Sequence, residues 1–167
     1  TMVDGVHFRQ GTIGWRDLGW KVLAVNLSDV AAMGCMPLYA VVTLGLQPDL
    51  PVDAILDAYH GMQDACERYG VAVVGGDIVR SPVLFLTVAM VGAGETSGTG
   101  REGSAAVLTR SGATPGDEGA VTGHVGCSAA GLRLLTQGLK TDAEAARHLT
   151  EAHVRPTLQQ AGGDEGA

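Results

Sequence analysis

Two aspartates lie in segments that are otherwise apolar. Asp29 sits in the run VNLSDVAAMG, and Asp77 follows a pair of glycines in VVGGDIV. A buried carboxylate without a partner is costly, so each aspartate either faces water or has a cation beside it. Two acidic side chains from separate elements, one of them beside a glycine pair, suit Mg²⁺ that bridges nucleotide phosphates. Pairing of Asp29 with a buried cationic side chain remains the alternative.

The glycine pair Gly75-Gly76 has two interpretations. It could form the turn of a hairpin, or it could lie inside a strand. The sequence RSP that follows shortly afterwards is the better turn signal, which leaves the glycines in an extended run. Glycines inside a strand often mark a bulge or a ligand that approaches the backbone.

Three further side chains are candidates for ligand contacts. Arg110 in LTRSGATPGD is of the type that binds phosphate oxygens through its planar fork, or it is an ordinary surface arginine. His7 lies in an alternating segment and is a hydrogen-bonded core histidine unless a pocket opens beside it. Tyr59 belongs either to the core or to a nucleotide contact. Neither a Walker A loop nor a G-x-G-x-x-G loop is found in the sequence.

The helices and strands that position these residues are predicted from the spacing of apolar residues and from cap and turn residues. Residues 16–34 predict a helix with Asp17 as its cap and Gly34 at its end. Residues 38–46 predict a strand, and residues 52–70 predict a helix that closes at the last glycine.

The rest of the chain mixes strands and helices. Residues 1–8 look extended, and the two apolar runs on either side of RSP read as hairpin-like neighbours. We therefore expect an α+β fold with a mixed or antiparallel sheet flanked by helices. The remaining expectations are a loop over 93–106, a strand within 116–126, a helix over 128–139 with Ser128 near its cap, a helix over 141–154 opened by Thr141 or Asp142, and a frayed end.

Composition excludes some classes of protein. The chain has 167 residues, is 46% hydrophobic and carries a net charge of −7, which argues against binding to a nucleic-acid backbone. No stretch approaches the length of a membrane span. Three widely spaced cysteines match no zinc or redox pattern and are typical of free thiols in a reducing cytoplasm.

Several motifs together resemble one family. VDGVHF, DLGWKVLAVNLSDVAAMGCMPLYA, YHGM, VVGGDIVRSP, LTRSGATPGD and TGHVGCSAAGL occur in the order and approximate spacing of the thiamine-monophosphate kinase family. That family belongs to the ATP-binding superfamily that includes aminoimidazole ribonucleotide synthetase. The resemblance covers most of residues 1–156 and implies the N-terminal domain of that fold.

The resemblance also implies an activity and a site. The reaction would be ATP-dependent phosphorylation of thiamine monophosphate to thiamine diphosphate, by direct Mg²⁺-assisted transfer without a covalent enzyme intermediate. The family is a homodimer built through the sheet of this half. Transferred by position, the roles are Mg²⁺ ligand for Asp29 and Asp77, ATP contact for Tyr59, Gly76, Asp77 and Arg110, and substrate contact for His7.

The resemblance further predicts how the chain is organised. Residues 1–140 would form the ATP-binding domain, incomplete at its start, and residues 141–167 a helix and the beginning of a second domain. Two other interpretations stay open, namely a non-catalytic nucleotide-binding or dimerisation module and a related superfamily enzyme with another substrate.

Overall fold

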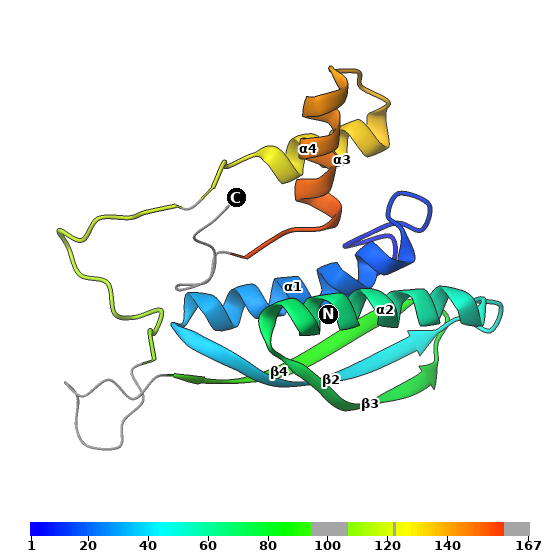
Figure 1. Cartoon of the computed structure of the whole chain (residues 1–167), viewed down its shortest axis with the longest axis horizontal. Coiled ribbons are helices and arrows are strands. Elements are labelled where there is room, and N and C mark those ends of the chain that lie inside the picture. Colours follow the sequence, from blue (N-terminus) through cyan, green and yellow to red (C-terminus); the bar gives the residue numbers. More distant parts are fainter. Residues whose placement is uncertain (95–106, 122, 159–167) are drawn as a thin grey trace.

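The chain folds around a four-stranded mixed sheet that two helices cover on one face (Figure 1). The computed structural model describes residues 1–94, 107–121 and 123–158. This architecture confirms the predicted α+β class. The elements are β1 (Met2–Val3), α1 (Trp15–Ala32), β2 (Cys35–Leu46), α2 (Val52–Tyr69), β3 (Ala72–Arg80), β4 (Phe85–Gly94), α3 (Cys127–Gln137) and α4 (Ala143–Val154).

Strand β2 is central, and the order in the sheet is β1-β4-β2-β3. It pairs with β3 in parallel and with β4 in antiparallel orientation. The expected hairpin of β3 and β4 is therefore wrong, because β2 lies between them. Helix α2 carries the chain back across the sheet, so β3 enters parallel to β2 and takes one side of it. The turn after β3, where Ser81 N donates to Leu46 O at 2.9 Å, then leads to the other side.

Helices α1 and α2 cross at very short range. A Cβ atom added to Gly19 would fall on the backbone carbonyl of Ala58, and one added to Gly61 would fall on the carbonyl of Arg16. The two glycines therefore let the helix backbones touch. Below the crossing, fully buried side chains of α1 meet those of the sheet, among them Leu23, Leu27, Val42, Leu44 and Leu86.

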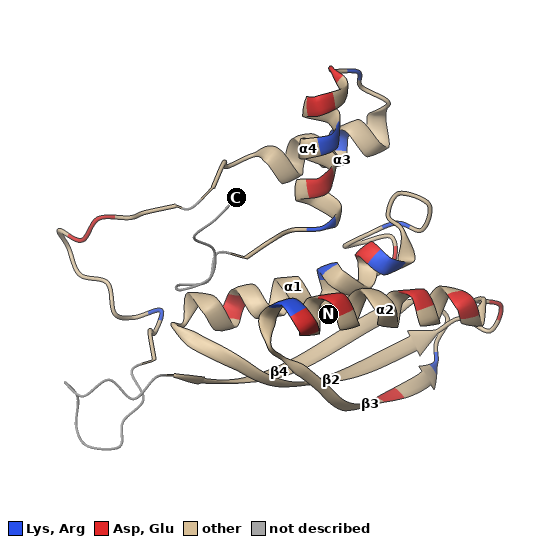
Figure 2. Cartoon of the chain, in the orientation of Figure 1, with Lys and Arg blue, Asp and Glu red and all other residues tan. Residues whose placement is uncertain are grey.

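The opposite face of the sheet is open and apolar. Residues of β2 alternate, so Val42 is buried under the helices while Tyr39 and Val41 point the other way, 53% and 42% exposed. Val91 of β4 pairs with Tyr39 and is 60% exposed. Figure 2 shows that β2 and β4 carry no charged residue, in agreement with their sequences. No described element covers this face.

The helix ends correct one expected cap and identify the residue at another. Helix α1 begins after Gly14, so Asp17 lies in its first turn and is not its cap. Helix α3 is capped by Gly126, and the Ser128 hydroxyl lies instead within 3.0 Å of a ring nitrogen of His153 on α4. The ends of α2 and α4 agree with the sequence. Gly70 adopts a left-handed conformation after α2 (φ 67°), and of the two candidates for α4 Asp142 is the cap, its Oδ1 accepting from Ala145 N at 2.8 Å.

Other expectations are corrected or lie outside the described residues. Of residues 1–8 only Met2–Val3 form a strand, because the backbone then turns at Gly5 (φ 78°). The described residues within 116–126 form no strand. Most of the predicted 93–106 loop and the last nine residues lie outside the described part. Helices α3 and α4 pack together as a pair. The expected domain boundary after residue 140 lies between these two helices and stays a prediction.

Candidate functional site

Asp29 lies in the last turn of α1 and is exposed to solvent. The Nδ2 of Asn26, one turn earlier, donates to the carbonyl of Val22 at 2.7 Å and is used within the helix. The last turn of a helix carries a partial negative charge, because its carbonyl groups have no partner within the helix. In α1 no basic side chain lies in this turn. Asp29 therefore adds negative charge to a negative helix end, an arrangement that a cation would stabilise. The described residues give it no buried cationic partner.

Asp77 lies on the open face of the sheet. Its register partner on β2 is Thr43, which alternates with the buried Val42 and so faces away from the helices. Asp77 is exposed, and its Oδ1 accepts from the backbone N–H of Ile78 at 2.9 Å. The carboxylate is thus oriented by its own strand and retains a second oxygen.

The glycine pair before Asp77 has a structural explanation. The register between β2 and β3 shifts at Ala40/Val41, so a bulge lies immediately before Gly75, which is one of the interpretations that the sequence offers. A Cβ on Gly76 would fall on the carbonyl of Val42. Gly76 is therefore required by the close approach of two strands, independently of any ligand.

The structure does not bring Asp29 and Asp77 together within one chain. Asp29 lies near the start of β2 at Cys35, whereas Asp77 is paired with Thr43 eight residues further along that strand. At 3.3 Å per residue this separation is about 25 Å, and the two side chains lie on opposite faces of the sheet. Within the described chain no group of three or more histidine, cysteine or acidic side chains is arranged to hold a metal.

The segment that contains Arg110 reaches the end of α1 where Asp29 lies. The segment that carries it is tied to that end, since Leu108 N donates to the carbonyl of Met33 at 3.0 Å. Gly34, with φ +66°, lies against the Leu108 side chain. The segment that carries Arg110 and the helix turn that carries Asp29 thus meet at one helix end, from distant parts of the sequence.

The two remaining candidates have different surroundings. Tyr59 of α2 is half-buried and packs against the hydrophobic core. His7 is exposed, and its Nδ1 accepts from Val3 N at 3.1 Å. His7 also lines a pocket of about 250 Å³, so the pocket on which its ligand role depends is present.

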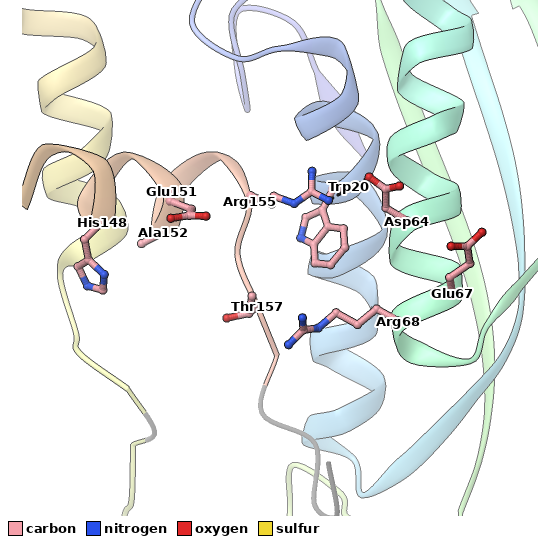
Figure 3. A pocket seen from close by; sticks show the side chains of 9 residues that line it. All are labelled: Trp20, Asp64, Glu67, Arg68, His148, Glu151, Ala152, Arg155 and Thr157. Carbon is pink, nitrogen blue, oxygen red and sulfur yellow. Dashed lines mark hydrogen bonds and ion pairs between the residues drawn. The ribbon is translucent and has the colours of Figure 1, made fainter. Parts of the chain in front are cut away.

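Sequence reasoning missed a cluster centred on Arg155, which follows α4. Its guanidinium lies 4.3 Å from the centre of the Trp20 ring and contacts Asp64 at 3.0 Å (Figure 3). It also contacts Asp17, at 3.2 Å. Trp20 Nε1 donates to the carbonyl of Pro156 at 2.7 Å. The cluster joins α4 to both α1 and α2. The sequence offered one sign of this cluster, an aspartate (Asp17) one helical turn before a tryptophan. The partner of Asp17 is Arg155, which lies 138 residues away and could not be recognised from the sequence.

Charge pairing in this cluster perturbs one carboxyl strongly. Arg16 donates to both oxygens of Asp64, at 2.7 and 2.8 Å, and together with Arg155 it holds the pKa of Asp64 well below its usual range. A pocket of about 710 Å³ beside the cluster is lined by Trp20 and Arg155 and by side chains of α2 and α4. Acidic and basic groups balance there, so the cluster is a structural connection.

The sequence of the chain is similar to that of one protein family and of several characterised enzymes. The family "AIR synthase related protein, N-terminal domain" matches residues 1–94. The thiamine-monophosphate kinase of Aquifex aeolicus is 37% identical over 156 residues, which cover 93% of this chain and 47% of that protein. The enzyme of the same name from Escherichia coli K12 is 42% identical over 159 residues, 94% of this chain and 45% of that protein. The chain thus spans about half the length of the curated relatives it matches.

Solved structures agree with the sequence comparison. The crystal structure of thiamine monophosphate kinase from Aquifex aeolicus has a TM-score of 0.83 and 35% identity, covering 95% of this chain and 50% of that one. A structure of AaThiL complexed with AMPPCP and TMP has the same TM-score and identity, covering 93% and 47%. No described helix is long and apolar enough to cross a membrane. On this evidence, the chain belongs to the AIR synthase related protein family and carries its N-terminal domain.

Proposed function

We propose that the protein containing this chain phosphorylates thiamine monophosphate to thiamine diphosphate with ATP, and that this chain supplies the ATP-binding domain. The observation that carries the proposal is the similarity to AaThiL complexed with AMPPCP and TMP, at a TM-score of 0.83. Transfer would be direct, with the protein positioning two phosphate groups and neutralising their charge.

Asp29 and Asp77 are proposed as ligands of Mg²⁺. The ion usually keeps several waters and is held by one or two carboxylates together with substrate phosphates, so a single carboxylate suffices at each position. Because the two side chains lie about 25 Å apart, they would serve different ions or different copies of the chain. When bound, Mg²⁺ would neutralise charge on the phosphates, and these two aspartates would hold the ion in place.

The other proposed contacts with ATP and with the substrate rest on the same family resemblance. Arg110 would bind phosphate oxygens beside Asp29, a role supported by the contact between its segment and the end of α1. Tyr59 and Gly76 are proposed as ATP contacts and His7 as the substrate contact. Residues 1–140 would make up the ATP-binding domain. The three free cysteines support a cytoplasmic location.

Replacing Asp77 by asparagine is expected to weaken Mg·ATP binding about tenfold, because the amide loses the charge that attracts the cation. Isothermal titration of the chain with ATP in excess Mg²⁺ measures this. Asp49→Asn is the matched control, since Asp49 is an exposed aspartate outside the proposed site. Equal weakening in both variants, or in neither, would reject the assignment of Asp77.

The activity is tested on the whole protein that is encoded by the reading frame containing this chain. With thiamine monophosphate and Mg·ATP it should form thiamine diphosphate, measured by chromatography. Binding of Mg·ATP without turnover of any phosphate acceptor would instead favour a nucleotide-binding module. Turnover of another acceptor would favour a different member of the superfamily.

The open face of the sheet supports a homodimer. It is apolar and uncharged along β2 and β4, and uncovered apolar faces of this kind mark protein interfaces. A second copy of the chain presents the same surface, so two open faces can pack against each other around a two-fold axis.

Val41→Glu should weaken the dimer, because one buried charge from each copy would meet at the interface. We expect the dissociation constant of the dimer to rise at least about tenfold. Sedimentation velocity over a range of protein concentrations measures the change. Val52→Glu is the control, since Val52 is an apolar residue at the start of α2 that is 74% exposed. A wild-type chain that remains monomeric at every concentration would contradict the proposed interface.

A further inference from the structure

Helices α3 and α4 form a pair on the side of α1 that faces away from the sheet (Figure 1). The pair is tightly packed, because a Cβ atom added to Gly131 of α3 would fall on the backbone carbonyl of Leu149 of α4. It is joined to the rest of the fold by the segment that follows α4, and also by the side chain of His153 within α4. These two attachments respond differently to pH.

The segment after α4 is held by contacts that persist in mild acid. Arg155 pairs with Asp64 at 3.0 Å, and the backbone N–H of Leu158 donates to the Tyr69 hydroxyl at 3.1 Å. Hydrogen bonds and charge from Arg16, and then from Arg155, hold the pKa of Asp64 well below its usual range. This attachment therefore stays intact at pH values where histidine gains a proton.

His153 lies where α4 meets both α1 and α3. Its Nε2 is 3.3 Å from Nζ of Lys21 on α1, and its Nδ1 is 3.0 Å from the Ser128 hydroxyl on α3. An ammonium group only donates, so Nε2 must accept and the ring proton sits on Nδ1, where it can donate to Ser128. The contact with α1 thus requires the neutral imidazole.

The titratable groups that face His153 from the neighbouring elements are all basic. It shares a pocket with Lys21 of α1 and with His7 and Arg9 of the turn after β1, and no acidic side chain is among the described residues that line this pocket. Helix α3 faces it with the uncharged Ser128. A proton on the ring therefore gains no ion pair there.

Acidic side chains on the same helices have other partners. Asp17 of α1 pairs with Arg155 at 3.2 Å, and Glu151 of α4 pairs with Arg147 at 3.5 Å. Burial first, and then the charge of Lys21, lower the pKa of His153. The folded chain thus disfavours the imidazolium form of this residue.

We propose that His153 is a proton-sensitive contact, whose protonation in mild acid separates the α3–α4 pair from α1 while the segment after α4 keeps the pair attached. A protonated ring carries N–H donors at both nitrogens, so Nε2 can no longer accept from Lys21. Two positive charges then face each other where the neutral form has a hydrogen bond. The inference concerns the docking of two helices and does not depend on the proposed function.

The pH range follows from the sign of the shift. A histidine whose pKa in the folded chain lies below the unfolded value of about 6.5 stabilises the docked state above that value. This contribution is lost as the pH falls through the pKa of the folded chain. Asp64 acts only below about pH 4, so its loss and that of His153 occur in separate pH ranges.

Hydrogen exchange of the whole chain at about pH 7.5 and about pH 5.5 tests the inference, with rates corrected for the intrinsic effect of pH. Protection of the amides in α3 and α4 should fall about tenfold at the lower pH, which corresponds to about one unit of difference between the folded and unfolded pKa. Protection of β2 should stay unchanged, because the sheet does not take part in this contact.

A variant isolates the imidazole. The side-chain oxygen of His153→Gln can accept from Lys21 at every pH, so this variant should keep the same protection of α3 and α4 at both pH values. His148→Gln is the matched control, since His148 is an exposed histidine of the same helix. It should retain the tenfold loss of the wild type. In the unaltered chain, NMR titration of the His153 ring should have the same midpoint as the loss of protection.

Four results would overturn the inference. They are full protection of α3 and α4 in the wild type at about pH 5.5, an equal loss of protection in β2, an undiminished loss in His153→Gln, and a ring titration whose midpoint differs from that of the loss. If the glutamine variant is unprotected at both pH values, the ring titration of the wild type decides alone.

Discussion

Replacing Gly61 by alanine is expected to lower the free energy of unfolding by about 3 kcal/mol. The new Cβ would fall on the carbonyl of Arg16, which belongs to the backbone of α1 and cannot rotate away. Alanine favours a helix over glycine by about 1 kcal/mol, but this gain is smaller than the cost of separating two packed helices. The clash therefore determines the sign of the effect.

Denaturant unfolding monitored by circular dichroism measures this change in stability. Gly19→Ala should behave similarly, because its Cβ would meet the carbonyl of Ala58 on the other helix. Gly119→Ala is the control, since nothing lies within 4 Å of its Cβ position. A Gly61→Ala protein as stable as the wild type would show that the two backbones do not touch.

Replacing Arg155 by methionine should cost about 3 kcal/mol and release α4 from the body of the fold. The guanidinium stacks on Trp20 and bonds to Asp17 and Asp64, so its loss leaves two partly buried carboxylates with fewer partners. Hydrogen exchange should accelerate in α3 and α4 before it does in β2. Arg147→Met is the control, because Arg147 makes a single exposed pair with Glu151 that is worth a few tenths of a kcal/mol.

The same variant should change the response to acid. Hydrogen bonds and charge from Arg16 first, and then from Arg155, keep the pKa of Asp64 below its unfolded value. Such a group stabilises the fold above the unfolded pKa of about 3.9 and loses this contribution as the pH falls further. The wild type should therefore lose stability below about pH 4, and Arg155→Met should lose less over that interval. An identical acid slope in both proteins would contradict the role of Arg155.

Local signals predicted much of the fold. The helical period and the glycine at position 70 predicted α2, and the glycine pair was interpreted as a sign of either a bulge or a ligand, of which the structure shows the bulge. The order of the strands could not be obtained this way, because a turn such as Ser81-Pro82 looks the same whether or not the strands it joins are neighbours. That choice depends on α2 placing β3 beside β2, which is a long-range event.

In the candidate site too, residue types could be predicted from the sequence but distances between residues could not. The residue types of Asp29 and Asp77 suggested a cation, yet their separation depends on strand register and on which face each occupies. Lys21 and His153 lie 132 residues apart in sequence and gave no shared pattern. Their contact exists only after α4 has docked, so it could be found only in the structure.

The position of β2 between β3 and β4 also sets the order in which the domain can form during synthesis. Residues 35–80 contain β2, α2 and β3, whose contacts are close in sequence, so this unit can assemble while the rest of the chain is still being made. Strand β1 is made before this unit but must wait for its partner, since Met2 pairs with Leu86. A segment of the domain that is made before α1 thus finds its place only after β4 has been made, and until then its apolar residues stay without their partners.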